Sequence, residues 1–234
     1  MKRLFWIFCL FVFGMIFLNS SFIRAEVEPN EAKLLLASSA LDEINSAPDQ
    51  AIPSNLLQGC SAVGIFPALK KGGYVVGGQF GRGVLTRRDP ESGKWSPPVF
   101  FKITGASFGL QFGFEEVDLV LVFTSDQSFQ NVLAQGIKVG VSIGATAGPV
   151  GRDASRTNSL SDREAIYAYS RSKGLFAGAT LSGTQIAYDY DATKEFYGDA
   201  YSAEMILLEN QIPPEKVPEP AVNFLETLKK YANA

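Results

Sequence analysis

The segment KKGGYVVGGQFGRGVLTRR, residues Lys70–Arg88, contains six glycines and five basic side chains within nineteen residues. Its valine, leucine and aromatic residues favour a β-strand, whereas glycine weakens a strand unless another backbone approaches closely or the sheet bends. The segment is not a dinucleotide-binding loop, because its later glycines follow the order G-x-x-G-x-G instead of G-x-G-x-x-G. We therefore interpret it as part of a tightly packed sheet with a charged rim.

Two later segments repeat this pattern. In GASFGLQFGF, strand alternation places Gly105, Gly109 and Gly113 on one face and large apolar residues on the other. In VGVSIGATAG, residues 139–148, one face of a strand is again nearly bare. We predict an α+β fold, in which a strongly coiled antiparallel β-sheet or small β-barrel is packed with N- and C-terminal helices.

The apolar spacing predicts helices before and after this sheet. They are PNEAKLLLASSALDEI (residues 29–44), with Asn30 as the N-cap, and PEPAVNFLETLKKYA (residues 218–232), with Pro220 at its start. A shorter helix is expected in SDQSFQNVLAQG, residues 125–136, and RRDPESGK, Arg87 to Lys94, has the composition of a hairpin loop.

The N-terminus is typical of a secretory signal peptide. Lys2 and Arg3 precede an apolar run from Leu4 to Leu18, and an acidic segment follows Ala25. We expect residues 1–25 to be a signal peptide, residues 26–234 to form a single domain with a C-terminal helical extension, and the protein to be periplasmic or secreted. An uncleaved N-terminal anchor is the alternative.

Composition excludes several functions. The chain has 21 basic and 24 acidic residues, and removal of Lys2, Arg3 and Arg24 leaves 18 basic and 24 acidic, a net charge of −6. A general nucleic-acid binder is basic, so we expect no nucleic-acid partner.

Histidine is absent, which removes the usual general base and a common metal ligand. Cys60 is alone in the mature chain and predicts a buried core residue. We expect no catalytic residue, metal or cofactor.

Charged residues cluster in three places. The acidic clusters around Glu115 to Asp118 and around Asp189 to Glu195 match no EF-hand spacing, and we interpret both as solvated loop ends. The basic set differs, because it stands out on an acidic chain and could bind anionic headgroups. Ordinary solvated strand ends are the alternative interpretation. The candidate lipid-binding residues are Lys70, Lys71, Arg82, Arg87 and Arg88.

Six phrases follow one another between about Leu34 and Tyr201: GIFPALKKGGYVVGGQFGRGVL, KWSPPVFFKITGASFGLQFG, VDLVLVF, TAGPVGR, YAYSRSKGLFAGATLSG and FYG. This ordered set resembles the SYLF domain, also called the Ysc84-like domain. The resemblance implies lipid binding, since eukaryotic relatives bind phosphoinositides such as phosphatidylinositol phosphates and bacterial relatives are secreted or envelope proteins described as lipid-binding. Lys70 and Lys71 match the basic-glycine motif of the family.

In eukaryotic members an amphipathic N-terminal helix aids membrane binding. The helix in the similar place here carries Glu31, Asp42 and Glu43 beside only Lys33 on its polar face, which suits an anionic bilayer poorly. We expect it to pack on the glycine-lined face of the sheet instead. Some relatives bind actin, a property that does not carry over to an exported protein.

Three functions follow from these observations. The first is a non-enzymatic lipid-binding domain of the bacterial envelope, with an anionic phospholipid or membrane surface as its partner. The second is a structural or protein-interaction module of the periplasm that binds another envelope protein. The third is a hydrolase that uses carboxylates and serine without histidine, which the composition favours least.

Overall fold

The structure is a computed structural model that describes residues 28–46, 51–135, 137–139, 145–148, 166–172, 175–178 and 184–232. The expected signal peptide lies outside these residues. The structure describes only the backbone of residues 73–76, 106–114, 135, 137–139, 145–147 and 175–178. In the described part of the chain, no helix is both long and apolar enough to cross a membrane.

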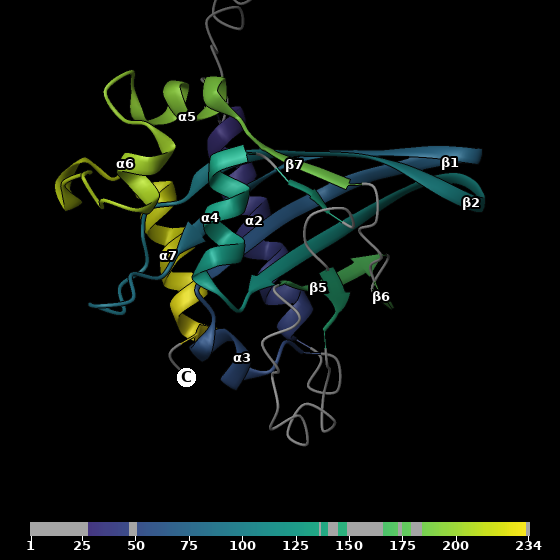
Figure 1. The fold of residues 1–234 in the computed structure, drawn as a ribbon, viewed down its shortest axis with the longest axis horizontal. Coiled ribbons are helices and arrows are strands. Elements are labelled where there is room, and N and C mark those ends of the chain that lie inside the picture. Colours follow the sequence, from purple (N-terminus) through teal and green to yellow (C-terminus); the bar gives the residue numbers. More distant parts are fainter. Residues whose placement is uncertain are drawn as a thin grey trace, which may run out of the picture.

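Two long strands form the centre of the fold (Figure 1). Strand β1 (Ala62–Arg87) and strand β2 (Val99–Phe123) pair antiparallel from Ala62↔Phe123 to Leu85↔Val99. The loop that joins them follows Arg87, as predicted. Asp89 closes it by accepting the backbone N–H of Glu91 and of Ser92. This antiparallel ribbon is the frame on which the other strands assemble.

The shorter strands occupy the other edge of β2. Strand β7 (Thr184–Tyr188) pairs with its N-terminal half and strand β5 (Ile166–Ser172) with its C-terminal half. Strands β3 (Ile137–Val139) and β6 (Leu175–Gly178) extend the sheet antiparallel beside β7 and β5. Strand β4 (Ala145–Ala147) pairs with β5 and is parallel to it. Of the strand predicted over residues 139–148, only its ends at β3 and β4 lie within the described residues, and these ends pair with β7 and β5.

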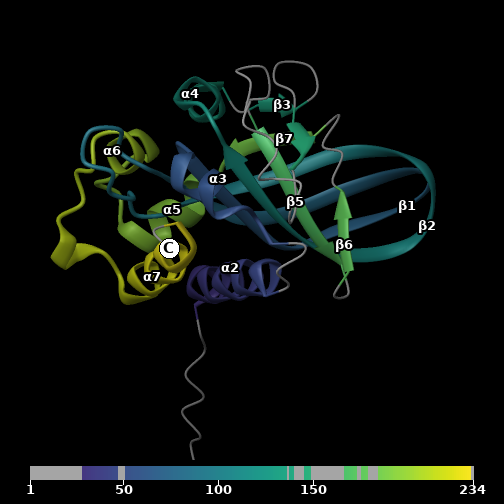
Figure 2. The ribbon, with the colours of Figure 1, turned by 90° about the horizontal axis from the view of Figure 1, so that it is seen from below.

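The α+β class and the antiparallel pairing are confirmed, but a small β-barrel is not formed. The ladder runs in the order β3-β7-β2-β5-β4, with β1 beside β2 and β6 beside β5, and among the described residues no pairing joins its ends. The sheet as a whole is open and is not strongly coiled. Instead, the β1/β2 ribbon turns back at the end of the molecule farthest from the helices (Figure 2).

Glycines allow the two halves of β1 to meet after this turn. A Cβ on Gly83 would lie 2.2 Å from the carbonyl oxygen of Ile65, and a Cβ on Gly81 would lie 2.8 Å from the Leu69 side chain. Real Cβ atoms do not approach backbone oxygen so closely, so the contact requires glycine at position 83. These glycines therefore allow two backbone segments to approach closely at one place. They do not close a barrel.

A β-bulge lies next to this contact. The register shifts between Phe66 and Leu69, and Ala68 adopts a positive φ of 51°. The carboxylate of Asp118 accepts the Ala68 backbone N–H at 2.9 Å. The shift changes which side chains of β1 face each side of the sheet, and it leaves Lys70 opposite Glu116.

Helices cover both sides of the sheet (Figure 2). Helices α2 (Pro29–Asn45), α3 (Ser54–Gly59) and α7 (Glu219–Ala232) share one apolar core with the sheet. Helices α4 (Asp126–Gln135) and α6 (Ala203–Leu207) share a second core on its other side. Helix α5 (Tyr190–Tyr197) follows β7, and a 3₁₀ turn (Pro214–Lys216) precedes α7.

The three predicted helices are confirmed, with two corrections. Helix α2 begins at Pro29, and Asn30 does not cap it but donates to the Glu195 carboxylate of α5 at 2.8 Å. Helix α2 does pack on the sheet, and it shares an apolar core with Ile65 and Val84 of β1; the glycine-lined face at Gly109 and Gly113 lies outside the described side chains. Cys60 is buried in the same core, as predicted, and burial raises the pKa of its thiol to about 12.

The approach of the two halves of β1 generates a prediction about stability. Gly83→Ala should destabilise the protein by about 1–3 kcal/mol, because the added methyl group overlaps the backbone of Ile65. Urea denaturation measures the difference. Gly59→Ala is the matched control, since a Cβ there meets nothing within 4 Å and the change should stay within about 0.5 kcal/mol. Equal midpoints for Gly83→Ala and the unsubstituted protein would contradict this account of the fold.

Candidate functional site

The turn of the ribbon brings basic residues together from different parts of the chain. Gly81 contacts Leu69, so the adjacent residues Arg82 and Lys70 come from neighbouring strand segments. Lys33 of α2 lies within electrostatic range of both. Lys102 stands directly opposite Arg82 in the β1/β2 ladder, so the two side chains share one face. We call Lys33, Lys70, Arg82 and Lys102 the cation cluster.

Asp189 is the buried acid of this cluster. Its carboxylate accepts from Nε and Nη2 of Arg82, each at 2.7 Å, and from Nζ of Lys102 at 2.9 Å. It also accepts the backbone N–H of Ala192 at 3.4 Å and thereby caps α5. Burial alone would raise the pKa of Asp189, but the hydrogen bonds from Arg82 and Lys102 outweigh it and lower that pKa. The interpretation of Asp189 as a solvated loop residue is therefore wrong.

The two cations that hold Asp189 still reach water. The Asp189 side chain is 0% exposed, whereas the side chains of Arg82 and Lys102 are 38% and 40% exposed. Each cation therefore spans from the buried carboxylate to the surface. In this geometry Asp189 fixes the direction of both side chains while their outer atoms remain accessible.

Lys33 lies close to two other positive charges of the cluster, those of Arg82 and Lys70. Burial lowers the pKa of the Lys33 ammonium, the nearby charges of Arg82 and Lys70 lower it further, and Asp118 acts in the opposite direction. Asp118 is itself half-buried, and burial raises its pKa although the Ala68 N–H opposes this. Two of the three charges that act on Lys33 are positive, which favours a bound anion.

Lys70 and Lys71 lie on opposite faces of β1, because successive side chains alternate. Lys70 is exposed and Lys71 is partly buried. In the ladder, Lys70 stands opposite Glu116 and Lys71 opposite Glu115. Burial lowers the pKa of Lys71, and the charge of Glu115 opposes this. Of the two lysines, Lys70 belongs to the cation cluster.

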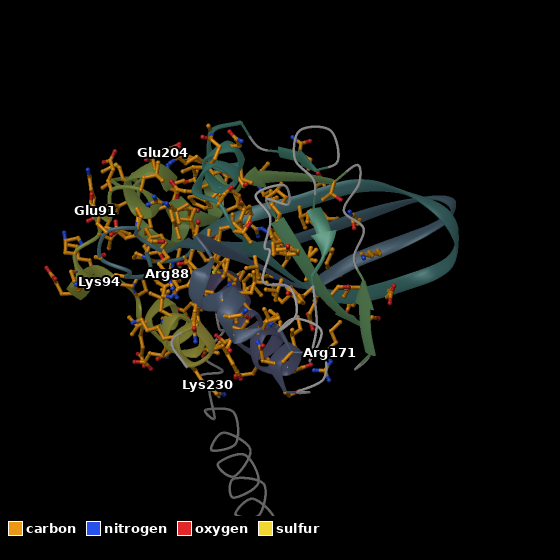
Figure 3. The ribbon with its side chains drawn as sticks, turned by 60° about the horizontal axis from the view of Figure 1, so that its bottom comes forward. Arg88, Glu91, Lys94, Arg171, Glu204 and Lys230 are labelled. Atoms are coloured by element: carbon orange, nitrogen blue, oxygen red, sulfur yellow. The ribbon has the colours of Figure 1, made fainter. Side chains whose placement is uncertain are left out.

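Arg87 and Arg88 lie away from the cluster. They follow Arg82 by five and six residues, which is roughly 16–20 Å along a strand. Arg87 is buried and bonds Asp126 at the start of α4 at 2.7 Å. Arg88 lies over the ring of Trp95 at 4.7 Å and donates to the carbonyl oxygens of Gln58 and Ala232. Figure 3 places it among the helices. The structure thus brings together Lys70 and Arg82 of the five candidates.

Sequence reasoning missed three members of this site. The sequence indicates Lys33 only as a single cation on the polar face of its helix, and it gives no signal for Lys102. A signal for Asp189 was present, because an aspartate directly after a strand and before a helical segment is a typical N-cap. Its pairing with Arg82, 107 positions away, could not be read from spacing. In the described residues, no group of three or more acidic, cysteine or histidine side chains could hold a metal ion.

The buried carboxylate generates a second prediction. Asp189→Asn should lower the free energy of unfolding by about 2 kcal/mol at neutral pH, because three charge-assisted hydrogen bonds from two cations are weakened while the cations can still turn to water. Because the folded pKa of Asp189 is lowered, its contribution is fully present above its ordinary pKa of 3.8 and is lost as the pH falls through the folded value.

Urea titrations of both proteins between pH 2.5 and 7 test this. The difference between them should be constant above about pH 4 and shrink below it. Asp199→Asn is the control, since Asp199 forms an exposed pair with Lys194 and should change stability little. A difference that is absent at pH 7, or that grows on acidification, is incompatible with a structural role for the carboxylate.

Comparisons with known proteins agree with the ordered glycine phrases. A family model described as "Ysc84: Las17-binding protein actin regulator" matches residues 104–231. The chain is 34% identical over 203 residues to "LAS seventeen-binding protein 3" of Saccharomyces cerevisiae, a match that covers 86% of this chain and 44% of that protein. It is 34% identical over 183 residues to "Protein YSC84" of the same yeast, covering 76% and 38%.

A mammalian relative also matches over most of the chain. "SH3 domain-containing YSC84-like protein 1" of Homo sapiens is 28% identical over 204 residues, which covers 86% of this chain and 58% of that protein. The chain therefore spans about two fifths to three fifths of the curated relatives it matches. Since the family model covers more than half of its residues, the chain belongs to the Ysc84 family and carries a Ysc84-like (SYLF) domain.

Proposed function

We propose that this chain is a non-enzymatic lipid-binding domain of the bacterial envelope that contacts anionic lipid headgroups through the cation cluster. Lys71 contributes as a neighbouring charge. Arg87 and Arg88 have other partners and are left out of the contact surface. The apolar N-terminal segment supports export, so the proposed location is periplasmic or secreted.

The observation that carries the proposal is the excess of positive charge around Lys33. Arg82 and Lys70 act on Lys33, and Lys102 stands opposite Arg82. Of the acids near the cluster, Asp189 is already bound to Arg82 and Lys102, and Glu116 stands opposite Lys70. Asp118 is committed to the backbone of the bulge. A phosphate group placed beside Lys33 and Lys70 would relieve repulsion that the folded protein otherwise maintains.

The surface position of the cluster supports a lipid headgroup as the anion. Lys70 is exposed, and Arg82 and Lys102 reach solvent at about two fifths of their side-chain surface. Each basic residue close to an anionic bilayer contributes about 1 kcal/mol of attraction. A cluster of four cations therefore suits a membrane surface, where many phosphates are available at once.

A protein partner is the second candidate. It is favoured by the family description, which names Las17 binding and actin regulation for members of the family. For an exported protein we propose an envelope protein as the partner in that case, and not actin. Capture of one such protein from envelope extract, together with no binding to anionic vesicles, would support this second function.

Charge reversal tests the lipid-binding function. Lys70→Glu/Lys71→Glu should weaken co-sedimentation with phosphatidylglycerol-containing vesicles at least roughly 30-fold, since reversal of the Lys70 charge alone changes the local charge by two units and costs about 2 kcal/mol. Binding of the unsubstituted protein should also fall as salt rises, because the attraction is screened over about 10 Å at 0.1 M. Vesicles of phosphatidylcholine alone should bind weakly.

Lys94→Glu is the matched control. Lys94 is exposed on the loop between β1 and β2, at the end of the molecule opposite the turn of the ribbon (Figure 3). It should leave vesicle binding nearly unchanged although the net charge changes in the same direction. Salt-independent binding would contradict the electrostatic contact, and an equal effect of Lys94→Glu would show that net charge and not the cluster is responsible.

A further inference from the structure

Phe80 is an exposed aromatic residue beside the cation cluster. Its side chain is 54% exposed, whereas other phenylalanines of the same two strands, Phe66, Phe100 and Phe101, are 0–2% exposed. Burial of a phenylalanine side chain contributes about 1.5–3 kcal/mol, so the folded chain forgoes this contribution at position 80. A single exposed apolar residue is common on protein surfaces. The residues around Phe80, however, indicate a role for this exposed side chain.

The strand face around Phe80 leaves its ring unshielded. The preceding residue on that face is Gly78, where even an added Cβ would meet nothing nearer than 3.8 Å. The following residue is Arg82, and the partner across the ladder is Thr104. Lys102 is the diagonal neighbour, at about 7–8 Å by strand geometry. The ring therefore projects from the sheet next to two cations of the cluster.

We propose that Phe80 inserts into the headgroup region of an anionic phospholipid bilayer while the cation cluster binds the phosphates around it. This inference rests on the proposed lipid-binding function and adds a contact that charge alone does not provide. Charge complementarity selects this occupant, because the cations gather on an otherwise acidic chain. The β1/β2 ribbon that carries Phe80 also extends beyond the helices (Figure 1).

A fluorophore placed at position 80 tests the insertion. Phe80→Cys is combined with Cys9→Ser and labelled with an environment-sensitive thiol dye. Cys60 stays unlabelled because it is buried and its thiol pKa is about 12. On phosphatidylglycerol-containing vesicles we expect a blue shift and quenching by brominated lipids, and neither change on pure phosphatidylcholine vesicles.

Leu35→Cys in the same Cys9→Ser background is the matched control. Leu35 is 55% exposed, nearly the same as Phe80, and lies two residues after Lys33 on α2, so it points away from the cluster. Its dye should remain in water. Quenching at position 35 and not at position 80 would overturn the inference and assign the membrane contact to the outer face of α2.

Phe80→Ser separates the apolar contact from the electrostatic one. It should weaken vesicle binding about tenfold, and this ratio should persist at 0.5 M salt, whereas the effect of Lys70→Glu/Lys71→Glu should shrink as salt rises. Charge-dependent binding with a dye at position 80 that stays in water would overturn this inference alone. Absence of any binding to anionic vesicles would overturn the proposed function with it.

Discussion

The contact between Gly83 and Ile65 is the constraint on which the rest of the structure depends. The two residues belong to one strand, and their backbones meet only because position 83 carries no side chain. This contact fixes where the β1/β2 ribbon turns back and which segments lie side by side afterwards. Leu69 comes to lie against Gly81, and the next residue of each segment is basic. The glycine pattern therefore determines the placement of charge as well as the path of the backbone.

An acidic protein can carry a locally positive surface because the interaction between exposed charges weakens with the distance between them. Exposed charges farther apart than about 8–10 Å are largely screened at physiological salt, so acidic residues elsewhere on the chain cancel little of the field at the cation cluster. Within the cluster, Asp189 is buried and bound to two of the cations, and Asp118 accepts a backbone N–H of the bulge. The net negative charge of the chain and a local affinity for anions are therefore compatible.

Local sequence patterns predicted the elements of this fold better than their arrangement. The apolar spacing identified α2 and α7, because Leu34, Leu41 and Phe224 are buried by the same periodicity that defines the helices. The glycine spacing indicated close backbone approach but not its location, and the predicted barrel was therefore wrong. The contact between residues 65 and 83 depends on a turn in the middle of a strand. The pairs Gly72-Gly73 and Gly77-Gly78 lie in this segment, but their spacing does not show which residues meet after the turn.

At the candidate site, too, the sequence predicted some features and only the structure showed the others. Lys70 and Arg82 were identified because they stand out within a glycine-rich strand of an acidic chain. Arg87 and Arg88 stood out for the same reason, and only three-dimensional structure shows that their partners are Asp126, the Trp95 ring and helix-end carbonyls. The sequence shows where charged residues are concentrated, but it does not show which of them already have partners. Lys33 and Lys102 come from other segments and required the fold to be known.

Asp189 has a role in binding that goes beyond neutralising charge. Arg82 has five N–H donors and uses two of its nitrogens on this carboxylate, and Lys102 uses one of its three ammonium donors. The remaining donors stay available on side chains that are already ordered. An anion that binds them therefore loses less free energy to side-chain ordering than one that binds freely rotating lysines. Lys70, which is exposed, complements this fixed pair because it can adjust to phosphates at different positions.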